Sequence, residues 1–334
     1  MYLWCKLQRR RRQHHESGLR GSRMKTPCPP WKLEDPCPCG SGRIFEQCCL
    51  GPNREIRVKV PSLTPPGPAT GYAHQRCYLR STNDCCNKIT LEDTISKNVL
   101  QAMARGSDLI EMGGLYWKAP GELVQLGINN LGSKVLCKRH NSALSPLDAA
   151  AGRLFRTLQE IAADIRNDSP SSEGKWFFVG GELIELWCLK VLCGLYYSNQ
   201  ITNQHQRISN TCKLDVERFI RALDDRQFRQ PCGLYLRVNA DGALKVEESV
   251  TTSPLCDADR NLLVGITIGV HGIEFDVLME DPGANFPPPQ QPAVFHPWHL
   301  LFCNSRRQHR IVMTWQDRTS FDTDIRYSTK PEER

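Results

Sequence analysis

The chain has 334 residues, of which 40% are hydrophobic and 24% charged, so it is long enough for about two domains with a sizeable core. No apolar run reaches the roughly 18 residues that a membrane span needs. The basic run Arg9–Arg12 is not followed by the apolar segment of a secretory signal. We therefore expect a cytoplasmic protein with no membrane partner.

The formal net charge of +7 comes entirely from the first 31 residues, which carry eight Lys or Arg and one acidic residue, Glu16. The rest of the chain is neutral overall. Such a tail can bind phosphate loosely or remain disordered, and Met24 is an alternative start of the chain. The overall charge therefore identifies no partner for the body of the protein.

The sixteen cysteines are expected to be reduced, because disulfides are rare in a large chain without an export signal. Reduced cysteines in such proteins are metal ligands, reactive thiols or small buried apolar residues. Eight of them lie in polar, turn-rich sequence between Cys37 and Cys137. Cys188 and Cys193 lie in an apolar stretch and are expected to pack in the core.

The N-terminal half divides into four regions. Residues 1–31 predict a basic, disordered tail, and residues 32–52 contain the first cysteine cluster. Residues 53–74 predict a semi-rigid linker, because Pro61–Pro68 is rich in proline, which lacks backbone donors and favours an extended backbone. A second cysteine-bearing region occupies residues 75–147.

Residues 148–230 predict a helical segment. Its first helix is expected to open at Ser145–Asp148, which has the N-cap serine, first-turn proline and early acid of a helix start. A second helix is expected after Gly180-Gly181, where a wide apolar face implies burial against more than one neighbour. A shorter helix is expected at Leu214–Leu223.

Residues 231–334 predict an antiparallel β-meander of about six strands, because apolar residues alternate with a period of two and turn sequences separate the runs. The expected strand pairs are Leu234–Val238 with Leu244–Val250, Leu262–Val270 with Ile273–Met279, and His299–Cys303 with Arg310–Trp315. The predicted fold class is therefore α+β.

The first cysteine cluster consists of Cys37, Cys39, Cys48 and Cys49, with the spacing C-x-C-x8-C-C. Four thiolates are the full ligand set of a closed structural zinc site. Gly40–Gly42 supplies the residues that a tight turn after the first pair requires. Because so short a segment has no core of its own, zinc binding would supply its folding free energy.

These cysteines and the Cys-Pro-Cys-Gly-Ser-Gly-Arg lead resemble the SEC-C motif, the zinc-binding tail of the preprotein-translocase motor ATPase, which is also appended to many unrelated bacterial proteins. The resemblance covers residues 32–52 and implies a small zinc module in a bacterial protein. It also implies a protein partner for the module, because in the translocase the motif contacts a chaperone and the ribosome. It does not imply a role in secretion.

The second cysteine cluster is expected to bind another zinc ion. Cys77 and Cys85 form one ligand pair, and Cys137 and His140 follow as a second pair about 50 residues later. Two separated pairs of thiolate or imidazole ligands are typical of a tetrahedral zinc site. Cys86 could replace Cys85 in this set.

The stretch around this cluster resembles zinc-braced HNH nucleases, whose pattern is C-x-x-C, acid-His-hydrophobic, Asn-Leu, then L-C-x-x-C-[HN]. The resemblance implies a zinc-braced ββα region, and it implies that Glu92 and Asn141 bind Mg²⁺ or another divalent cation. It assigns Asn130 as the residue that orients the base, and it makes DNA or RNA the expected partner. Asp93 stands where these nucleases have the histidine that activates water.

Asp93 separates two functional hypotheses, a catalytically impaired region and an active nuclease. A carboxylate with a pKa of about 4 is a much weaker base than imidazole beside a metal, although it could bind the metal instead. We therefore expect a zinc-binding protein whose HNH-like, nucleic-acid-associated region is catalytically impaired. The alternative is an active endonuclease that hydrolyses phosphodiester bonds. The local charge, nine Lys or Arg against six acids from Arg76 to Asn141, does not decide between them.

Overall fold

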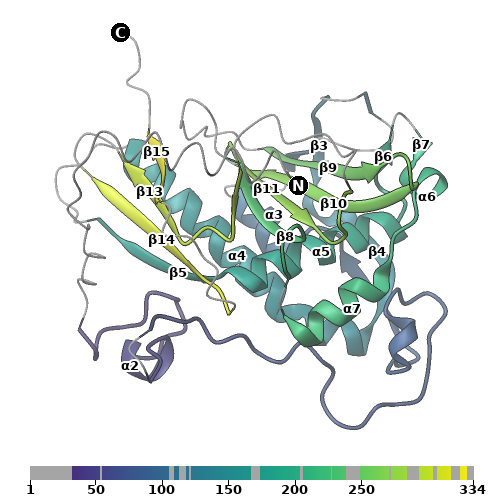
Figure 1. Cartoon of the computed structure of the whole chain (residues 1–334), viewed down its shortest axis with the longest axis horizontal. Coiled ribbons are helices and arrows are strands. Elements are labelled where there is room, and N and C mark those ends of the chain that lie inside the picture. Colours follow the sequence, from purple (N-terminus) through teal and green to yellow (C-terminus); the bar gives the residue numbers. More distant parts are fainter. Residues whose placement is uncertain are drawn as a thin grey trace.

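The computed structural model describes residues 32–52, 55–104, 109–112, 118–119, 122–166, 174–203, 206–226, 228–237, 249–270, 272–283, 293–303, 307–316 and 324–328. These residues form an α+β structure in which two sheets flank a pair of long helices (Figure 1). The mixed fold class is as predicted, whereas the arrangement of the strands differs. No helix among the described residues is long and apolar enough to cross a membrane.

The larger sheet contains seven strands, in the order β12 (Ala293–Phe295), β8 (Gly233–Arg237), β11 (Ile273–Leu278), β10 (Leu262–Val270), β9 (Ser249–Asp257), β2 (Leu109–Met112) and β3 (Val124–Gly127). At its centre, β10 and β11 form the predicted hairpin, in which Val270 pairs with Ile273. All neighbours are antiparallel except β2 and β9.

The smaller sheet contains four strands, in the order β15 (Asp324–Ser328), β13 (His299–Cys303), β14 (Gln308–Thr314) and β5 (Trp176–Gly180). β13 and β14 form the antiparallel pair that the sequence predicts. β15 and β5 join the two outer sides of this pair in parallel orientation. β5 comes from the middle of the chain and is an edge strand among the described residues.

The prediction of one C-terminal meander was therefore wrong. β8 pairs with β11 and β12, and it forms no hairpin with the following strand. That strand, β9, begins at Ser249 and pairs with β10 and β2, while residues 238–248 lie outside the described residues. Side-chain alternation identifies a strand and its buried face, but it carries no information about which strand lies beside it.

Helix α4 (Lys138–Arg166) begins seven residues before the predicted start at Ser145. Pro146 was expected in the first turn because proline has no N–H to donate to the carbonyl four residues earlier, which here is that of Ser142. The Ser145 hydroxyl donates to that carbonyl instead, at 2.9 Å. The helix therefore continues through the proline and crosses the predicted boundary between residues 147 and 148.

Helix α5 (Gly181–Tyr197) follows Gly180 as predicted and is buried along most of its length. Trp187 is 1% exposed and meets Phe155 of α4 edge to face, with ring centroids 5.5 Å apart. The two helices thus form the centre of the core. Three further described helices are α3 (Lys97–Ala104), which precedes α4, and α6 (Ile208–Thr211) and α7 (Val216–Asp225), which follow α5.

The N-terminal region contributes a separate two-stranded antiparallel sheet of β1 (Ile89–Asp93) and β4 (Gly132–Cys137). Since α4 follows β4 without a break, the end of β4 and the first turn of α4 are held together. The remaining short elements are α2 (Phe45–Cys48), η1 (Arg80–Thr82), η2 (Ile128–Leu131), β6 (Thr202–Asn203) and β7 (Gln206–Arg207).

Candidate metal centres

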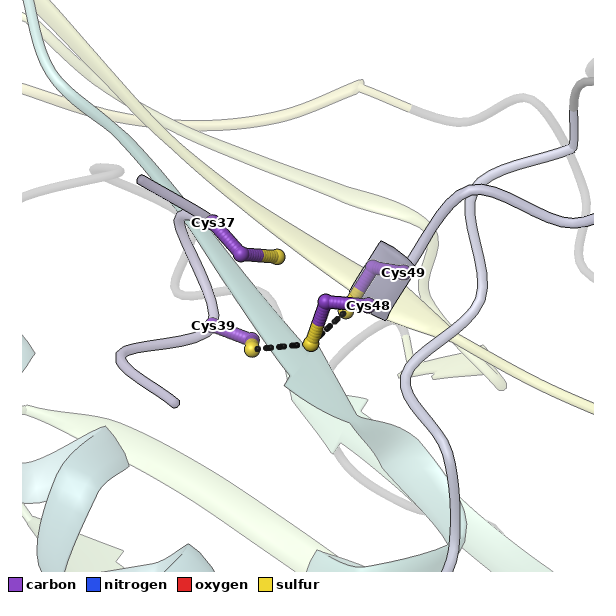
Figure 2. Close-up of side chains that lie close together, drawn as sticks. All are labelled: Cys37, Cys39, Cys48 and Cys49. Carbon is purple, nitrogen blue, oxygen red and sulfur yellow. Dashed lines mark hydrogen bonds between the residues drawn. The ribbon is translucent and has the colours of Figure 1, made fainter. Parts of the chain in front are cut away.

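The first cysteine cluster brings Cys37, Cys39, Cys48 and Cys49 together, with all four sulfur atoms within 4.8 Å of one another. The Sγ atoms of Cys39 and Cys48 are 3.4 Å apart, and those of Cys48 and Cys49 are 3.9 Å apart (Figure 2). The first pair precedes a turn in which Gly40 has a φ of +73°, a conformation that favours glycine. The second pair comes from the end of α2 and the residue after it.

The environment of these thiols fits a bound divalent cation. Burial raises the pKa of Cys37 to about 11, whereas a hydrogen bond from Cys49 lowers the pKa of Cys39 to about 4. A soft divalent cation would favour the thiolate form of all four, and the four-sulfur donor set fits zinc.

The segment that carries this cluster is docked on the smaller sheet (Figure 1). The Phe45 ring of α2 packs against Phe178 of β5, with centroids 5.9 Å apart. The backbone N–H of Phe178 donates to the carbonyl of Pro38 at 3.2 Å. Further along, the N–H of Val58 donates to Oγ1 of Thr314 at 3.1 Å. The cluster is thus part of a packed interface.

The second cluster brings together Cys77, Cys85, Cys137 and His140, whose ligand atoms also lie within 4.8 Å of one another. Nδ1 of His140 is 3.4, 3.7 and 3.3 Å from the sulfurs of Cys77, Cys85 and Cys137. All four residues are buried. Three sulfurs and one imidazole nitrogen are a common closed zinc ligand set.

The residues around the second cluster orient its imidazole. Nε2 of His140 lies 3.1 Å from Oγ1 of Thr82, which leaves Nδ1 directed at the sulfurs. Burial lowers the pKa of His140, so the neutral ring that a metal requires is favoured. Asp84 and Arg139 form a two-point ion pair at 2.9 and 3.0 Å, which ties the loop beside Cys85 to the start of α4.

Cys86, the alternative fourth ligand, lies outside this group. Its sulfur is 3.6 Å from the carbonyl of Lys88 and 3.4 Å from the N–H of Arg139. The structure therefore favours Cys85 over Cys86. Together the two groups contain the eight residues that the sequence analysis predicted as zinc ligands.

The residues predicted to form the nuclease centre are differently placed. Glu92 on β1 is 5% exposed and forms an ion pair with Lys190 of α5. Asn141 donates from Nδ2 to Oγ1 of Thr90 at 3.1 Å, and Asn130 is exposed in η2. Asp93 follows Glu92 and is half-buried, and burial raises its pKa.

Lys190 is the main residue of this site that the sequence analysis missed. Its ammonium lies against Glu92 and 2.7 Å from both carboxylate oxygens of Asp148. Burial raises the pKa of Glu92 to about 7, although the charge of Lys190 acts in the opposite direction. A lysine within an apolar helix was the available signal, since a buried cation needs an acidic partner.

The network around Lys190 extends to two further side chains. Ser96 donates to Asp148, and the indole Nε1 of Trp187 donates to Oγ of Ser96 at 2.7 Å. These hydrogen bonds join the start of α3 to α4 and α5. Among the described residues, the two groups of His, Cys, Asp or Glu that could hold a metal do not include Glu92, so the predicted Mg²⁺ site has no support.

Comparison with known protein families matches residues 35–51 to the SEC-C motif. The first cluster is a SEC-C motif. The match includes all four cysteines of that cluster, which confirms this part of the predicted resemblance, whereas the HNH resemblance receives no support. No curated protein and no solved structure matches the chain. What is established is therefore a SEC-C motif protein with two cysteine-rich groups that could hold zinc.

Proposed function

We propose that this protein is a zinc-stabilised protein that associates with nucleic acid and does not cleave it. The observation that carries the noncatalytic part is the Lys190 ammonium, which contacts both Glu92 and Asp148. A nuclease metal needs free carboxylates at this point, because cation coordination and transition-state charge stabilisation depend on them. Here a cation of the protein itself neutralises them.

The predicted base supports the same proposal. Asp93 replaces the histidine of HNH nucleases, and burial raises the pKa of its carboxyl, with Lys97 opposing this rise. A carboxylate that gains some basicity in this way still lacks the imidazole geometry that the family uses. Water activation at Asp93 would also need the metal whose ligand, Glu92, is already paired.

The association with nucleic acid rests on the charge beside the second cluster. The segments 75–91 and 132–141, which supply its four ligands, contain six Lys or Arg and one acid, Asp84. Asp84 is already paired with Arg139. This local excess is larger than the balance over the whole stretch from Arg76 to Asn141, and a local basic surface is the usual footprint of a phosphate-binding protein.

Metal content and nuclease activity test the proposal directly. We expect two zinc ions per chain, and we expect binding of labelled DNA or RNA. Incubation with plasmid DNA or RNA and Mg²⁺, Mn²⁺ or Ni²⁺ should give no cleavage above that of Glu92→Gln. Cleavage by the wild type that this isosteric variant loses would establish the alternative, an active HNH-type endonuclease. Absence of any nucleic-acid binding would reject the association.

A further inference from the structure

We infer that the surface over the second cluster binds single-stranded nucleic acid, through a strip of basic side chains and two exposed tyrosines on segments that contact the same region. This inference rests on the proposed function and deepens it by naming the surface and the form of the ligand. The basic strip consists of Arg76, Arg80, Lys88, Lys134 and Lys138.

Backbone hydrogen bonds place the three segments of the basic strip side by side. β1 and β4 are paired, with Ile89 opposite Cys137, and the N–H of Lys138 donates to the carbonyl of Lys88 at 2.8 Å. On the other edge of β4, the N–H of Tyr78 donates to the carbonyl of Val135 at 3.0 Å. The segment 76–80, β4 and β1 therefore lie in that order across one ribbon.

The charges of the basic strip are available to a ligand. All five side chains belong to exposed residues, and none forms an ion pair with an acidic residue in the described part of the chain. Of the acids in these segments, Asp84 is held by Arg139 and Glu92 by Lys190, while Asp93 is half-buried at the far end of β1. Phosphates would thus meet uncompensated positive charge along the strip.

Two exposed tyrosines belong to segments that contact the metal-binding region. Tyr197 is 38% exposed and stacks on Tyr78, with ring centroids 5.5 Å apart and an interplanar angle of 17°. Tyr72 is 45% exposed, and its carbonyl accepts from the N–H of Cys85 at 2.8 Å. The ring of Tyr196 also meets Tyr197, with centroids 5.2 Å apart, and the ring of His74 meets Tyr72 at 6.1 Å. Both tyrosine side chains are thus held by neighbours and remain partly exposed.

The combination of basic and aromatic groups favours single-stranded over double-stranded nucleic acid as the ligand. Unpaired bases stack on exposed aromatic rings, and each stack contributes about 1–3 kcal/mol. In a duplex the bases are already stacked, so Tyr72 and Tyr197 would gain no such contact. If all five basic residues contact phosphates, log Kobs should fall with log salt with a slope of about −3.5 for a single strand.

The test uses the full zinc-loaded chain and fluorescence anisotropy with labelled 20-nucleotide dT and U oligomers, the matching 20-base-pair duplex, and poly-glutamate as competitor. We expect the single strands to bind at least about tenfold more tightly than the duplex, with that salt slope. Poly-glutamate should compete weakly. Tighter binding of the duplex, or displacement by equimolar poly-glutamate, would overturn the assignment to single strands.

Matched variants locate the surface. Lys138→Glu should weaken binding about tenfold, whereas Arg156→Glu should leave it unchanged, since Arg156 is exposed on the same helix about 27 Å away. Tyr197→Ala should weaken binding and Tyr197→Phe should restore it, because stacking needs the ring and not the hydroxyl. Zinc content is measured for each variant, and Lys134→Glu replaces Lys138→Glu if the latter loses metal.

The outcomes separate this inference from the proposed function. If the wild type binds neither single strands nor duplex, the nucleic-acid association itself fails. If the wild type binds and the strip and tyrosine variants bind equally well, only the surface assigned here is wrong. Loss of binding in the strip variants with unchanged zinc content supports both.

Discussion

The two cysteine clusters are both buried, but they are built at different ranges along the chain. The ligands of the first lie between Cys37 and Cys49, in one loop and one short helix. Those of the second come from a loop at Cys77 and from the junction of β4 and α4 at His140, 63 residues later. The first metal would organise a local segment, whereas the second would join distant parts of the core.

This difference indicates how much of the molecule each metal would stabilise. The first segment meets the body through the packing of Phe45 on Phe178 and through the hydrogen bond from Phe178 to Pro38. The second cluster takes His140 from the first turn of α4, one of the two helices at the centre of the core. A structural metal contributes its binding free energy to whatever it folds, so the cost of removing each metal should spread over a different part of the molecule.

The largest effect is expected from the second cluster. Cys137→Ser should lower the free energy of unfolding by at least about 5 kcal/mol, because the β4–α4 junction loses its link to the loop at Cys77. Cys48→Ser, the matched change in the first cluster, should cost about 2 kcal/mol or less and confine faster hydrogen exchange to residues 35–60. Denaturation and exchange mass spectrometry measure both. Equal and global losses would break the comparison.

The next largest effect on the free energy of unfolding is expected at Lys190, the buried ammonium that pairs with Glu92 and Asp148. Lys190→Met leaves the buried Glu92 and the half-buried Asp148 without their partner, and breaking a buried pair costs about 3–5 kcal/mol. The double variant Lys190→Met/Glu92→Gln should recover part of this loss, since one uncompensated carboxylate is removed. Urea denaturation of the zinc-loaded proteins measures it. No recovery would show that Lys190 acts through packing alone.

A smaller, local effect is expected at the docked face of the first cluster. Phe45→Ala removes the ring that contacts Phe178, at a cost of about 2 kcal/mol or less, because only the docked segment is released. The loss should appear as faster hydrogen exchange at the Phe178 amide, with α4 unchanged. Leu33→Ala in the same segment is the control, because Leu33 is 40% exposed. An unchanged Phe178 amide in Phe45→Ala would mean that the packing contact does not hold the segment.

The smallest effect concerns pH. Burial raises the pKa of Glu182 to about 7, above its ordinary value of 4.5, so the folded state holds this proton more tightly. The resulting stabilisation is complete below pH 4.5 and is lost as the pH rises through about 7. Between pH 6 and 8.5 Glu182 should account for a loss of about 1 kcal/mol. Glu182→Gln should remove this share and leave that of Glu92, whose pKa is also raised to about 7. Glu46→Gln, at an exposed site, should not.

The sequence predicted those features whose parts are close together in the chain. The SEC-C ligands span a short stretch, and the β10–β11 hairpin is closed by the turn between Val270 and Ile273. The second ligand set was found because its residue types are distinctive, although its spacing left Cys85 and Cys86 as alternatives.

Long-range partners could not be predicted in the same way. Nothing in the strand pattern of β14 indicates that its neighbour is β5, more than a hundred residues earlier. Lys190 and Glu92 are also far apart in the chain, and no local rule relates a helix lysine to a strand glutamate. The local sequence therefore left open both the strand order and the charge state of the predicted nuclease centre.

The hydrogen bond from Phe178 to Pro38 has a consequence for solubility. β5 is an edge strand in the described part of the smaller sheet, and exposed edges recruit strands of other chains. The SEC-C segment occupies a donor on this edge and covers the apolar patch of Phe178 and Val312. Removing the segment would therefore expose this edge and its apolar patch. A chain truncated in this way should self-associate more readily than it binds another protein.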